Sequence, residues 1–529
     1  MKNPAWDQNI SETYLELTCH HLPMVKKIID TYGDMPLLEY AQILIPKPGI
    51  KTYQSQKDVL KVVYDYVKPL LGESVAQQTV KDLDTYPVIL TASHHGVEYF
   101  SQTFQARLIF SLNVLKQRIP TSTIPVFACG NIPLNNAVYP RGALIYQVAP
   151  EAFEAIPIKL PLFPDRLKRS VVSSAPGFDL EMIDRTSSKA NQMVKAKKIS
   201  SLISDPLHHI FQKNYGSESV VHLPTYSDQS VVVNHLIWKQ LFPQFESVPN
   251  SICLEFEKIS GSLIKIDLLN PQSLLWFILF DPELRRHLLS ELDGINGCWN
   301  QEALEYQQSV STPDKQHDIS MAQCGTIFFW GVDDKGRKLS LNIKTNDAHI
   351  PVFSGIDDNG NLWEWPYSQE AIIDGISKGR LLPSVFLCFV VLLFARGLAC
   401  VGGYFQGIYL PAMKKGLISA LKKIQKYENL IALIVQVKTD YYLDGMQAVM
   451  ARINNKYMVP AGPLEIIANG GITTSDIDKM STLTVREAHL ADMFETIQDA
   501  VPARTLPLGW KKLLSADIYQ LLSHKVVVK

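Results

Sequence analysis

The 529-residue sequence lacks several features that identify a class of protein directly. Its seven cysteines include no CxxC pair and are odd in number, so we expect no disulfide framework and a reducing, cytoplasmic location. The 51 Lys and Arg residues are balanced by 52 Asp and Glu residues. This balance argues against a protein whose main function is to bind nucleic-acid phosphates. The N-terminal residues contain no apolar signal-peptide core. These absences exclude the secreted disulfide-rich class and disfavour a nucleic-acid partner.

Long hydrophobic runs are also scarce. The longest, Leu381 to Ala395, is shorter than the ~20 residues that span a bilayer, contains Pro383, and is followed directly by Arg396. We therefore predict a buried core helix in this segment and no membrane partner. The nucleotide-binding signatures GxGxxG and GxxxxGK[ST] and the metalloprotease signature HExxH do not occur.

What the sequence does contain is ordinary globular material, 46% hydrophobic and 19% charged. Its patterns predict an α/β fold in which a parallel-sheet, Rossmann-like core carries inserted subdomains and helical regions at both ends. We expect five segments: an N-terminal helical region (1–80), the first part of the core (81–150), an inserted subdomain (151–220), the second part of the core with a β-hairpin insertion (221–415), and a mostly helical C-terminal region (416–529). The long amphipathic helices of the last segment are compatible with a homodimer.

The core is predicted from two short apolar runs, 86–92 and 124–129, which flank an amphipathic helix expected from about Tyr99 to Gln117. Strand, helix and strand in this order form a βαβ unit, and continuous apolar strands are typical of a parallel sheet that is covered on both faces. In such sheets ligands bind outside the carboxyl ends of the strands. The loops that follow the two runs are therefore the best candidate site by position.

The first of these loops is Ser93-His94-His95-Gly96. Its glycine allows close approach of a ligand to the backbone, and the start of the following helix suits a phosphate or carboxylate. His94 or His95 is a candidate general base because imidazole titrates near neutral pH. A purely structural loop remains the alternative.

The second loop contains Asn131, Asn135 and Asn136 and leads to Arg141. The three amides offer uncharged donors and acceptors, and the guanidinium can clamp a carboxylate or phosphate with two hydrogen bonds. A turn rich in Asn and Pro explains the same residues without a ligand.

A third loop, Gly402-Gly403-Tyr404, lies between an apolar run and a helix, where it can form the opposite wall of the same cleft. The remaining candidates are weaker: Cys129 as a nucleophile at the end of the second run, and the pairs His208–His209, His317–Asp318 and Asp347–His349. None of them has the spacing of a metal-ligand set, so no metal site is predicted.

The order of these motifs resembles that of the cysteine-adding enzymes of bacillithiol biosynthesis. The likeness rests on five short segments: Ser93–Gly96, Ile124–Phe127, Leu134–Tyr139, Leu382–Val385 and Cys400–Phe405. The resemblance covers about residues 80–145 and 325–415. The sequence differs from the family where His94 and His95 replace glutamines.

The resemblance implies a nucleotidyltransferase-like Rossmann core and a bacterial biosynthetic enzyme, a ligase or transferase, that joins an amino acid to an amine-bearing small molecule. A nucleotide is the cofactor that it suggests. We therefore expect a C–N bond-forming enzyme that acts on a small polar metabolite. Two alternatives remain open: a metal-dependent hydrolase that uses His94 or His95, and a non-catalytic binding protein on the same scaffold.

Overall fold

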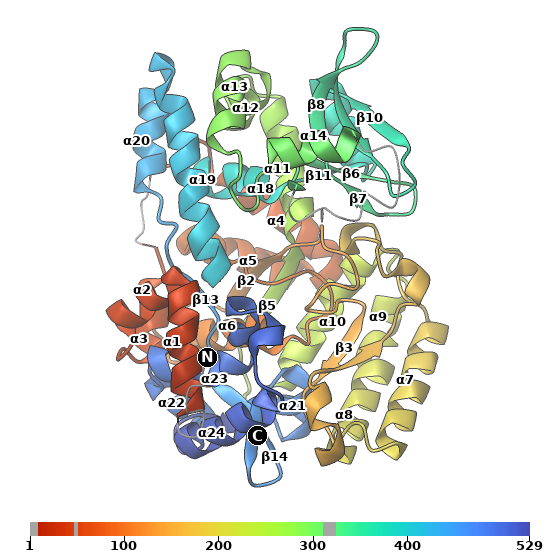
Figure 1. Ribbon diagram of the computed structural model, residues 1–529, viewed down its shortest axis with the longest axis vertical. Coiled ribbons are helices and arrows are strands. Elements are labelled where there is room, and N and C mark those ends of the chain that lie inside the picture. Colours follow the sequence, from red (N-terminus) through yellow and green to blue (C-terminus); the bar gives the residue numbers. More distant parts are fainter. Residues whose placement is uncertain (1–8, 47–50, 310–323) are drawn as a thin grey trace.

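A parallel five-stranded sheet lies at the centre of the computed structural model, which describes residues 9–46, 51–309 and 324–529 (Figure 1). The strands follow the order β13-β12-β1-β2-β5, and each pairs with its neighbour in parallel. Their bounds are β1 (Val88–Leu90), β2 (Thr123–Ala128), β5 (Asn250–Glu255), β12 (Ala399–Gly403) and β13 (Tyr442–Asp444). The predicted α/β class is confirmed, and the two apolar runs form β1 and β2.

The sheet separates two hydrophobic cores because alternate strand residues point to opposite faces. Leu90 and Val126 belong to one core, with side chains of α6 (Ser101–Leu115), whereas Ile89 and Phe127 belong to the other. The second core also contains side chains of α4 (Lys57–Leu71), α5 (Glu73–Thr85) and α11 (Phe256–Leu268). Both faces of the sheet are therefore covered, which explains why its strands are continuously apolar.

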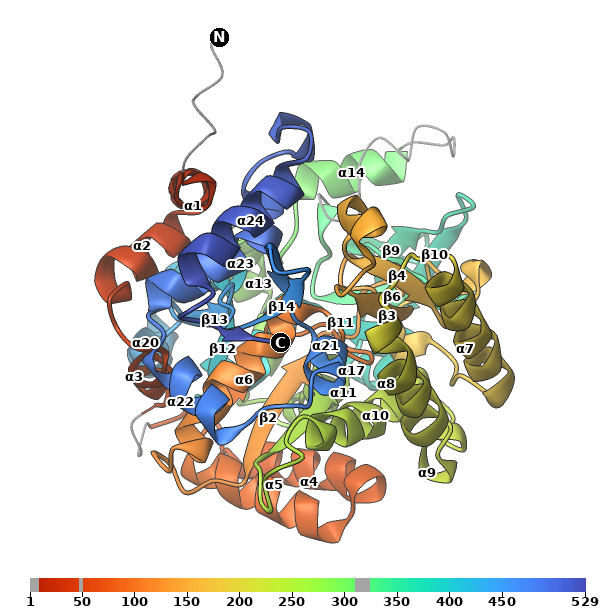
Figure 2. The same cartoon turned by 90° about the horizontal axis from the view of Figure 1, so that it is seen from below.

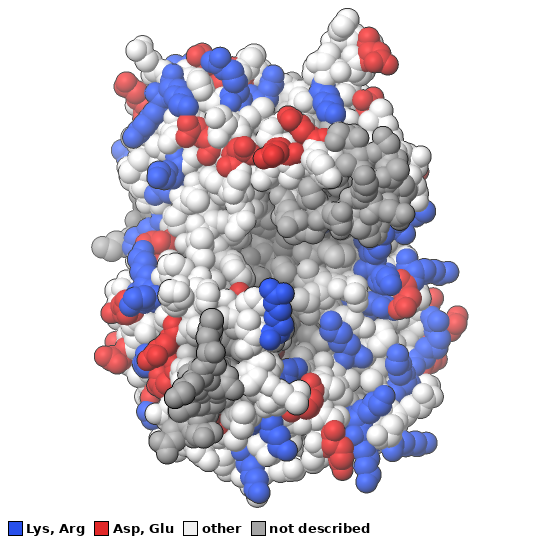
Figure 3. Space-filling view, viewed as in Figure 1, with Lys and Arg blue, Asp and Glu red and all other residues white. Residues whose placement is uncertain are grey.

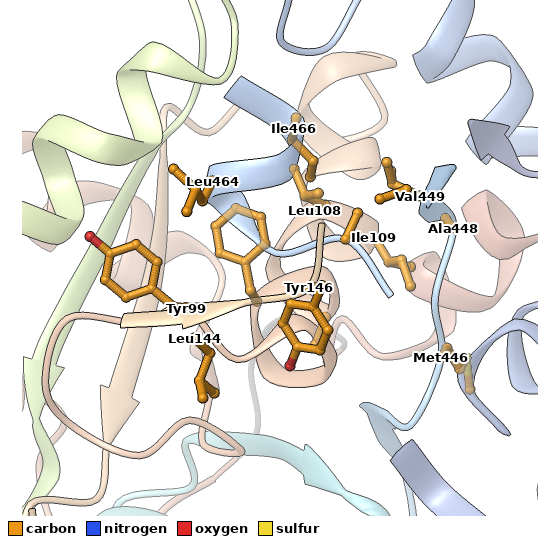
Figure 4. Close-up of a cluster of buried hydrophobic side chains, with 14 of the residues drawn as sticks. Tyr99, Leu108, Ile109, Leu144, Tyr146, Met446, Ala448, Val449, Leu464 and Ile466 are labelled. Carbon is orange, nitrogen blue, oxygen red and sulfur yellow. The ribbon is translucent and has the colours of Figure 1, made fainter. Parts of the chain in front are cut away.

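The helix between β1 and β2 is confirmed, but its predicted amphipathic character is wrong. Residues 101–113 of α6 are all buried, polar ones included. The helix lies between the sheet and a further layer of C-terminal elements, so it has no solvent face. Figure 4 shows Leu108 and Ile109 of α6 beside Leu464 and Ile466, with Tyr99 and Tyr146 in the same cluster.

The remaining elements surround this centre, and Figure 2 shows them from below. The N-terminal helices that precede the sheet are α1 (Ile10–His21), α2 (Pro23–Tyr32), α3 (Leu37–Ile43), α4 and α5. Between β2 and β5 the chain forms β3 (Gly142–Ile145), β4 (Ile158–Pro161), α7 (Leu180–Lys195), α8 (Ser204–His209), α9 (Glu218–Val221) and α10 (Tyr226–Gln240).

Between β5 and β12 the described chain adds helices and antiparallel strands. After α11 these are α12 (Leu274–Phe280), α13 (Pro282–Glu291), α14 (Gln301–Ser309), β6 (Phe329–Val332), β7 (Lys338–Leu339), β8 (Asn342–Thr345), β9 (Pro351–Ile356), β10 (Leu362–Pro366), α17 (Gln369–Ser377), β11 (Leu381–Pro383) and α18 (Val385–Phe389). The predicted β-hairpin is present as β6 and β7, joined by the turn at residues 333–336.

The C-terminal region was expected to be mostly helical, yet its first strand, β13, forms one edge of the core sheet. The other elements after β12 are α19 (Tyr404–Lys422), α20 (Glu428–Gln436), β14 (Val449–Ile453), β15 (Tyr457–Pro460), α21 (Pro463–Ala468), α22 (Thr474–Thr482), α23 (Val485–Ala500), α24 (Trp510–Leu522) and β16 (Val527–Val528).

The apolar segment Leu381–Ala395 is buried, as predicted, but it is not one helix. Its first three residues form β11 and pair with β6. Ser384 then caps α18 by accepting a hydrogen bond from the Leu387 N–H, and a π-helical turn follows over Val390–Phe394. Among the described residues no helix is both long enough and apolar enough to cross a membrane.

Candidate active site at the carboxyl edge of the sheet

The loops after β1 and β2 lie side by side because the two strands remain paired beyond their ends. The His95 N–H donates to the Cys129 carbonyl at 2.8 Å, and the Cys129 N–H donates to the Ser93 carbonyl at 2.9 Å. The chain runs from β1 outward to β2 and β5 and then returns to place β12 on the other side of β1. This reversal is the topological switch point at which open α/β sheets bind ligands.

A buried carboxyl group occupies this edge. Glu257, in the first turn of α11, accepts hydrogen bonds from the Gly130 N–H (2.6 Å), the Asn131 N–H (3.3 Å) and the Cys129 thiol (3.1 Å). Burial, together with the nearby Glu255 carboxylate, raises the pKa of Glu257 to about 7, although the Gly130 N–H acts in the opposite direction. Glu257 can therefore accept or release a proton near neutral pH, as a general acid or base must.

Polar atoms without partners occur in the loops at this edge of the sheet. In the described part of the chain, His94 Nδ1, His95 Nδ1, Asn131 Nδ2 and Ser173 Oγ are buried and make no hydrogen bond. Ser173 belongs here because its N–H donates to the Gly130 carbonyl at 3.0 Å. Buried polar atoms are rarely left unpaired in folded proteins, so a concentration of them indicates a place for water or a ligand.

Burial keeps both histidines uncharged at neutral pH. It lowers the pKa of His94 to about 4 and that of His95 to about 4, against opposing effects of Asn136 on His94 and of Glu255 on His95. His95 Nε2 lies 3.0 Å from Ser227 Oγ and 3.1 Å from the Ser227 carbonyl. With such low pKa values the imidazoles are weak bases, better suited to hydrogen bonding than to proton abstraction.

Positive charge reaches the same edge from two directions. The Lys338 ammonium of β7 lies 4.2 Å from the centre of the Trp330 ring and makes no hydrogen bond or ion pair with any described residue. Burial lowers its pKa, while the neighbouring Cys129 and Glu257 act to raise it. Lys258, by contrast, is paired with Asp228 at 2.7 Å. Lys338 is therefore the cation that is better placed to bind an anionic group.

Cys129 is not activated as a nucleophile. Burial raises the pKa of its thiol well above the ordinary value, and the negative charge of Glu257 adds to the effect. The thiol is consequently protonated at neutral pH, whereas nucleophilic cysteines react as thiolates. Its contact with Glu257 makes it a hydrogen-bond donor to that carboxylate.

Several predicted site residues make contacts within the protein that stabilise the loops. Gly96 has φ +127°, and a Cβ there would lie 2.6 Å from Pro140 Cβ, so this glycine allows two loops to pack. Ser93 Oγ accepts a hydrogen bond from Arg107 at 3.2 Å. The Arg141 guanidinium donates to the Phe163 carbonyl at 2.8 Å and pairs with Asp165.

The three predicted asparagines lie in different surroundings and do not form one binding surface. Asn131 lies at the strand edge, as described above, and Asn136 affects the His94 imidazole. The Asn136 side chain also accepts the Val138 N–H at 3.3 Å within its own turn. Asn135 is exposed to solvent.

The third predicted loop lies at the end of β12, next to Asp444 of β13. A Cβ on Gly402 would lie 2.0 Å from Gln406 Oε1, and one on Gly403 would lie 2.9 Å from Asp444 Oδ2. The Tyr404 hydroxyl donates to Asp499 at 2.6 Å. Thr91, directly after β1, donates to Gln406 at 2.9 Å and so links this loop to the first one.

Apart from Cys129, the weaker candidates do not join either loop cluster. His208 and His209 are exposed on α8, and Asp347 and His349 lie in an exposed turn between β8 and β9. The pair at 317–318 falls outside the described residues. Across residues 9–46, 51–309 and 324–529, no group of three or more His, Cys, Asp or Glu side chains is arranged to hold a metal ion.

Sequence reasoning missed Glu255, Glu257 and Lys338. The two glutamates could have been found, because they follow a third apolar run, Ser251–Leu254, and so obey the rule that selected residues 93–96. Lys338 had no such signal, since only the tertiary fold brings its hairpin to the sheet edge. No protein family, curated protein or solved structure was found to match the chain.

The raised pKa of Glu257 has a consequence for stability. The folded chain keeps this proton up to about pH 7, whereas an unfolded glutamate releases it near 4.5. The contribution of Glu257 to the free energy of unfolding is therefore complete below pH 4.5 and is lost as the pH rises to about 7. Relative to the Glu257→Gln variant, we expect the free energy of unfolding to fall by about 1.4 kcal/mol per pH unit within this interval.

Thermal unfolding of both proteins across the interval measures this difference, with Glu246→Gln, at an exposed site, as the control. Parallel stability curves for the wild type and Glu257→Gln would contradict the raised pKa.

Proposed function

We propose that this chain is an enzyme that forms a C–N bond between an amine and an activated carbon of a small polar metabolite. The reaction class comes from the resemblance of the sequence motifs to the cysteine-adding enzymes. The residue roles come from the geometry at the carboxyl ends of β1, β2 and β5. The observation that carries the proposal is the buried Glu257 carboxyl, which accepts hydrogen bonds from the loop after β2 and has a pKa raised to about 7.

In the proposed step Glu257 is the general base. It accepts a proton from the attacking amine, the N–C bond forms, and the bond from that carbon to its leaving group breaks. This role moves from His94 and His95 to Glu257, because a base with a pKa near the working pH is more effective than an imidazole with a pKa of about 4. The two histidines and Asn131 then orient the substrate through their unpaired nitrogens.

Lys338 supplies the anion-binding group of the proposed site. Its ammonium is unpaired among the described residues and lies close enough to Glu257 for the two charges to interact. A substrate carboxylate or phosphate is the complementary partner, and a phosphate of a bound nucleotide belongs to the same chemical class. We also propose that the core is nucleotidyltransferase-like and that the protein is cytoplasmic. All seven cysteines are unpaired, which supports a reducing compartment.

The experiment is to incubate the purified chain with a metabolite extract and to compare products by mass spectrometry. We expect new masses that equal an amine plus a second metabolite less its leaving group, formed by the wild type and by Glu246→Gln but not by Glu257→Gln. Product masses that arise only by addition of water, and only with added Zn²⁺ or Mn²⁺, would instead support the hydrolase alternative and overturn the proposal. The absence of any change would overturn it as well.

A further inference from the structure

The residues of the proposed active site are closed off from solvent in this structure. Glu257 is 2% exposed, His95 is 0% exposed and Asn131 is 4% exposed. A substrate can reach the Glu257 carboxyl only if a neighbouring element moves. Such an element has to be held by few contacts, because a local opening costs the contacts that it breaks.

Segment 170–174, which follows β4 in the chain, lies against the loop that binds Glu257. The Ser173 N–H donates to the Gly130 carbonyl at 3.0 Å, and the Gly130 N–H donates to the Glu257 carboxyl at 2.6 Å. A second backbone hydrogen bond joins the segment to the same loop two residues further along. The segment is therefore fixed directly beside the carboxyl group of the proposed site.

The tip of the β6–β7 hairpin, defined here as residues 332–338, lies on the other side of this segment (Figure 1). The Val171 N–H donates to the Gly336 carbonyl at 2.8 Å, and Ser170 Oγ donates to the Lys335 carbonyl at 2.9 Å. In the space-filling view from the same side, the surface is hollowed where the upper and lower parts of the molecule meet (Figure 3). The tip also carries the anion-binding lysine of the proposed site.

The hairpin tip is held by a small hydrophobic cluster that is separate from both main cores. The four buried members of this cluster are Val171, Trp330, Val332 and Leu382. The base of the hairpin is held more firmly, since Phe329 and Leu339 belong to the second core. Alternate residues of β6 thus point to different clusters. The tip can separate from Val171 while the base stays in place.

The charged contact at the tip is also a modest one. Asp358, in the turn between β9 and β10, pairs with Arg169 at 2.7 Å and with Arg337 of the tip at 2.6 Å. The Arg169 side chain is 47% exposed, and partly exposed ion pairs contribute little to stability. The pairs therefore define the closed position of the tip without preventing it from opening.

We propose that the hairpin tip is a lid over the proposed active site, that Val171 is the latch that keeps it closed, and that its opening admits the substrate. Opening also withdraws Lys338, so the anion-binding group returns only when the lid closes on a bound substrate. The inference rests on the proposed function for the purpose of the lid, whereas the opening is a property of the chain without substrate.

The rate at which iodoacetamide labels Cys129 in the full chain measures the opening, with peptide mass spectrometry as the readout. Cys129 directly precedes Gly130 and lies near enough to Lys338 for the ammonium to act on its pKa. Val171→Ala removes two methyl groups from the latch. We expect it to increase the rate of Cys129 labelling about tenfold.

Two controls separate lid opening from general loss of stability. Cys19, on α1 and far from the hairpin in the chain, should be labelled at the wild-type rate in Val171→Ala. Val63→Ala makes the same truncation at a buried position of the second core and should not increase Cys129 labelling selectively.

A reversible covalent lock gives the complementary test. A Cβ at Gly336 would lie 3.6 Å from Ser170 Cβ, within the range that a disulfide spans. Oxidation of the double variant Ser170→Cys with Gly336→Cys by glutathione disulfide should stop Cys129 labelling and formation of the product masses described above. Reduction should restore both, and each single variant treated in the same way is the control.

Unchanged Cys129 labelling in Val171→Ala would overturn the lid, as would labelling of the oxidised double variant at the rate of its reduced form. Equal acceleration at Cys19 and Cys129 would overturn it too, because that result indicates global unfolding. Labelling that changes as expected, in a wild type that forms no product, would support the moving tip and overturn the proposed function alone.

Discussion

Replacing Glu257 by glutamine is expected to lower kcat by roughly 10²- to 10⁴-fold, the usual contribution of a positioned general base. Glutamine keeps the size of the side chain and can still accept hydrogen bonds from the Gly130 and Asn131 N–H groups, so the fold at the strand edge should be preserved. What it cannot do is accept a proton. KM should change much less than kcat, because the amide removes proton transfer rather than substrate binding.

The pH dependence of the wild type adds a second requirement. Since the pKa of Glu257 is about 7, activity should rise with pH through that value as the carboxyl loses its proton. Glu246→Gln, at an exposed site, should keep both the rate and the profile of the wild type. A Glu257→Gln variant with at least half of the wild-type kcat would show that another group takes the proton.

The largest expected effect on stability is that of Arg396→Ala, which should lower the free energy of unfolding by roughly 3–5 kcal/mol, as loss of one partner from a buried ion pair does. The guanidinium is 0% exposed and forms two hydrogen bonds with Asp267, at 3.0 and 2.5 Å, and one with Asp58 at 3.0 Å. Removing it leaves the Asp267 carboxylate, 1% exposed, without its counter-charge.

Denaturant or thermal unfolding of the variant measures this loss. The matched control is Arg486→Ala, which breaks a partly exposed pair with Glu12 and should cost under about 1 kcal/mol. A similar decrease in the free energy of unfolding for both variants would contradict the expectation that the buried Arg396 ion pair contributes more to stability than the partly exposed Arg486 pair.

Arg396 also illustrates what the sequence could and could not predict. An arginine after a short apolar run was used as an argument against a membrane span, and the structure has no spanning helix among its described residues. That the arginine itself would be buried was not predictable, because its partners Asp58 and Asp267 come from α4 and α11, far away in the chain. Local patterns carry no information about such contacts.

The central strands were predictable for a clear reason. Strands covered on both faces are continuously apolar, and the runs that became β1 and β2 stand out from their polar flanks. The edge strand β13 (Tyr442–Asp444) is as short as β1 but is not part of a longer apolar run, because Asp440 precedes it and Asp444 ends it, so it was missed. For the same reason Asp444 was not recognised as a strand-end residue.

The candidate site was predicted in position more than in chemistry. His94, His95 and Asn131 do lie at the carboxyl edge, since strand ends follow from the apolar runs. Which groups titrate near pH 7 depends on burial and neighbouring charge, and these lower the pKa of the histidines while raising that of Glu257. Arg141 was predicted to clamp an anion, but local sequence patterns could not reveal that its guanidinium would pair with Asp165.

The account depends most on the protonation of Glu257, which can be measured without knowing the substrate. Infrared difference spectra of the wild type minus Glu257→Gln, recorded across a pH titration, isolate the carboxyl band of this one residue. The account predicts a protonated carboxyl that loses its proton near pH 7. A carboxylate already fully ionised at about pH 5, close to the ordinary glutamate pKa, would contradict the assignment of Glu257 as the proton acceptor.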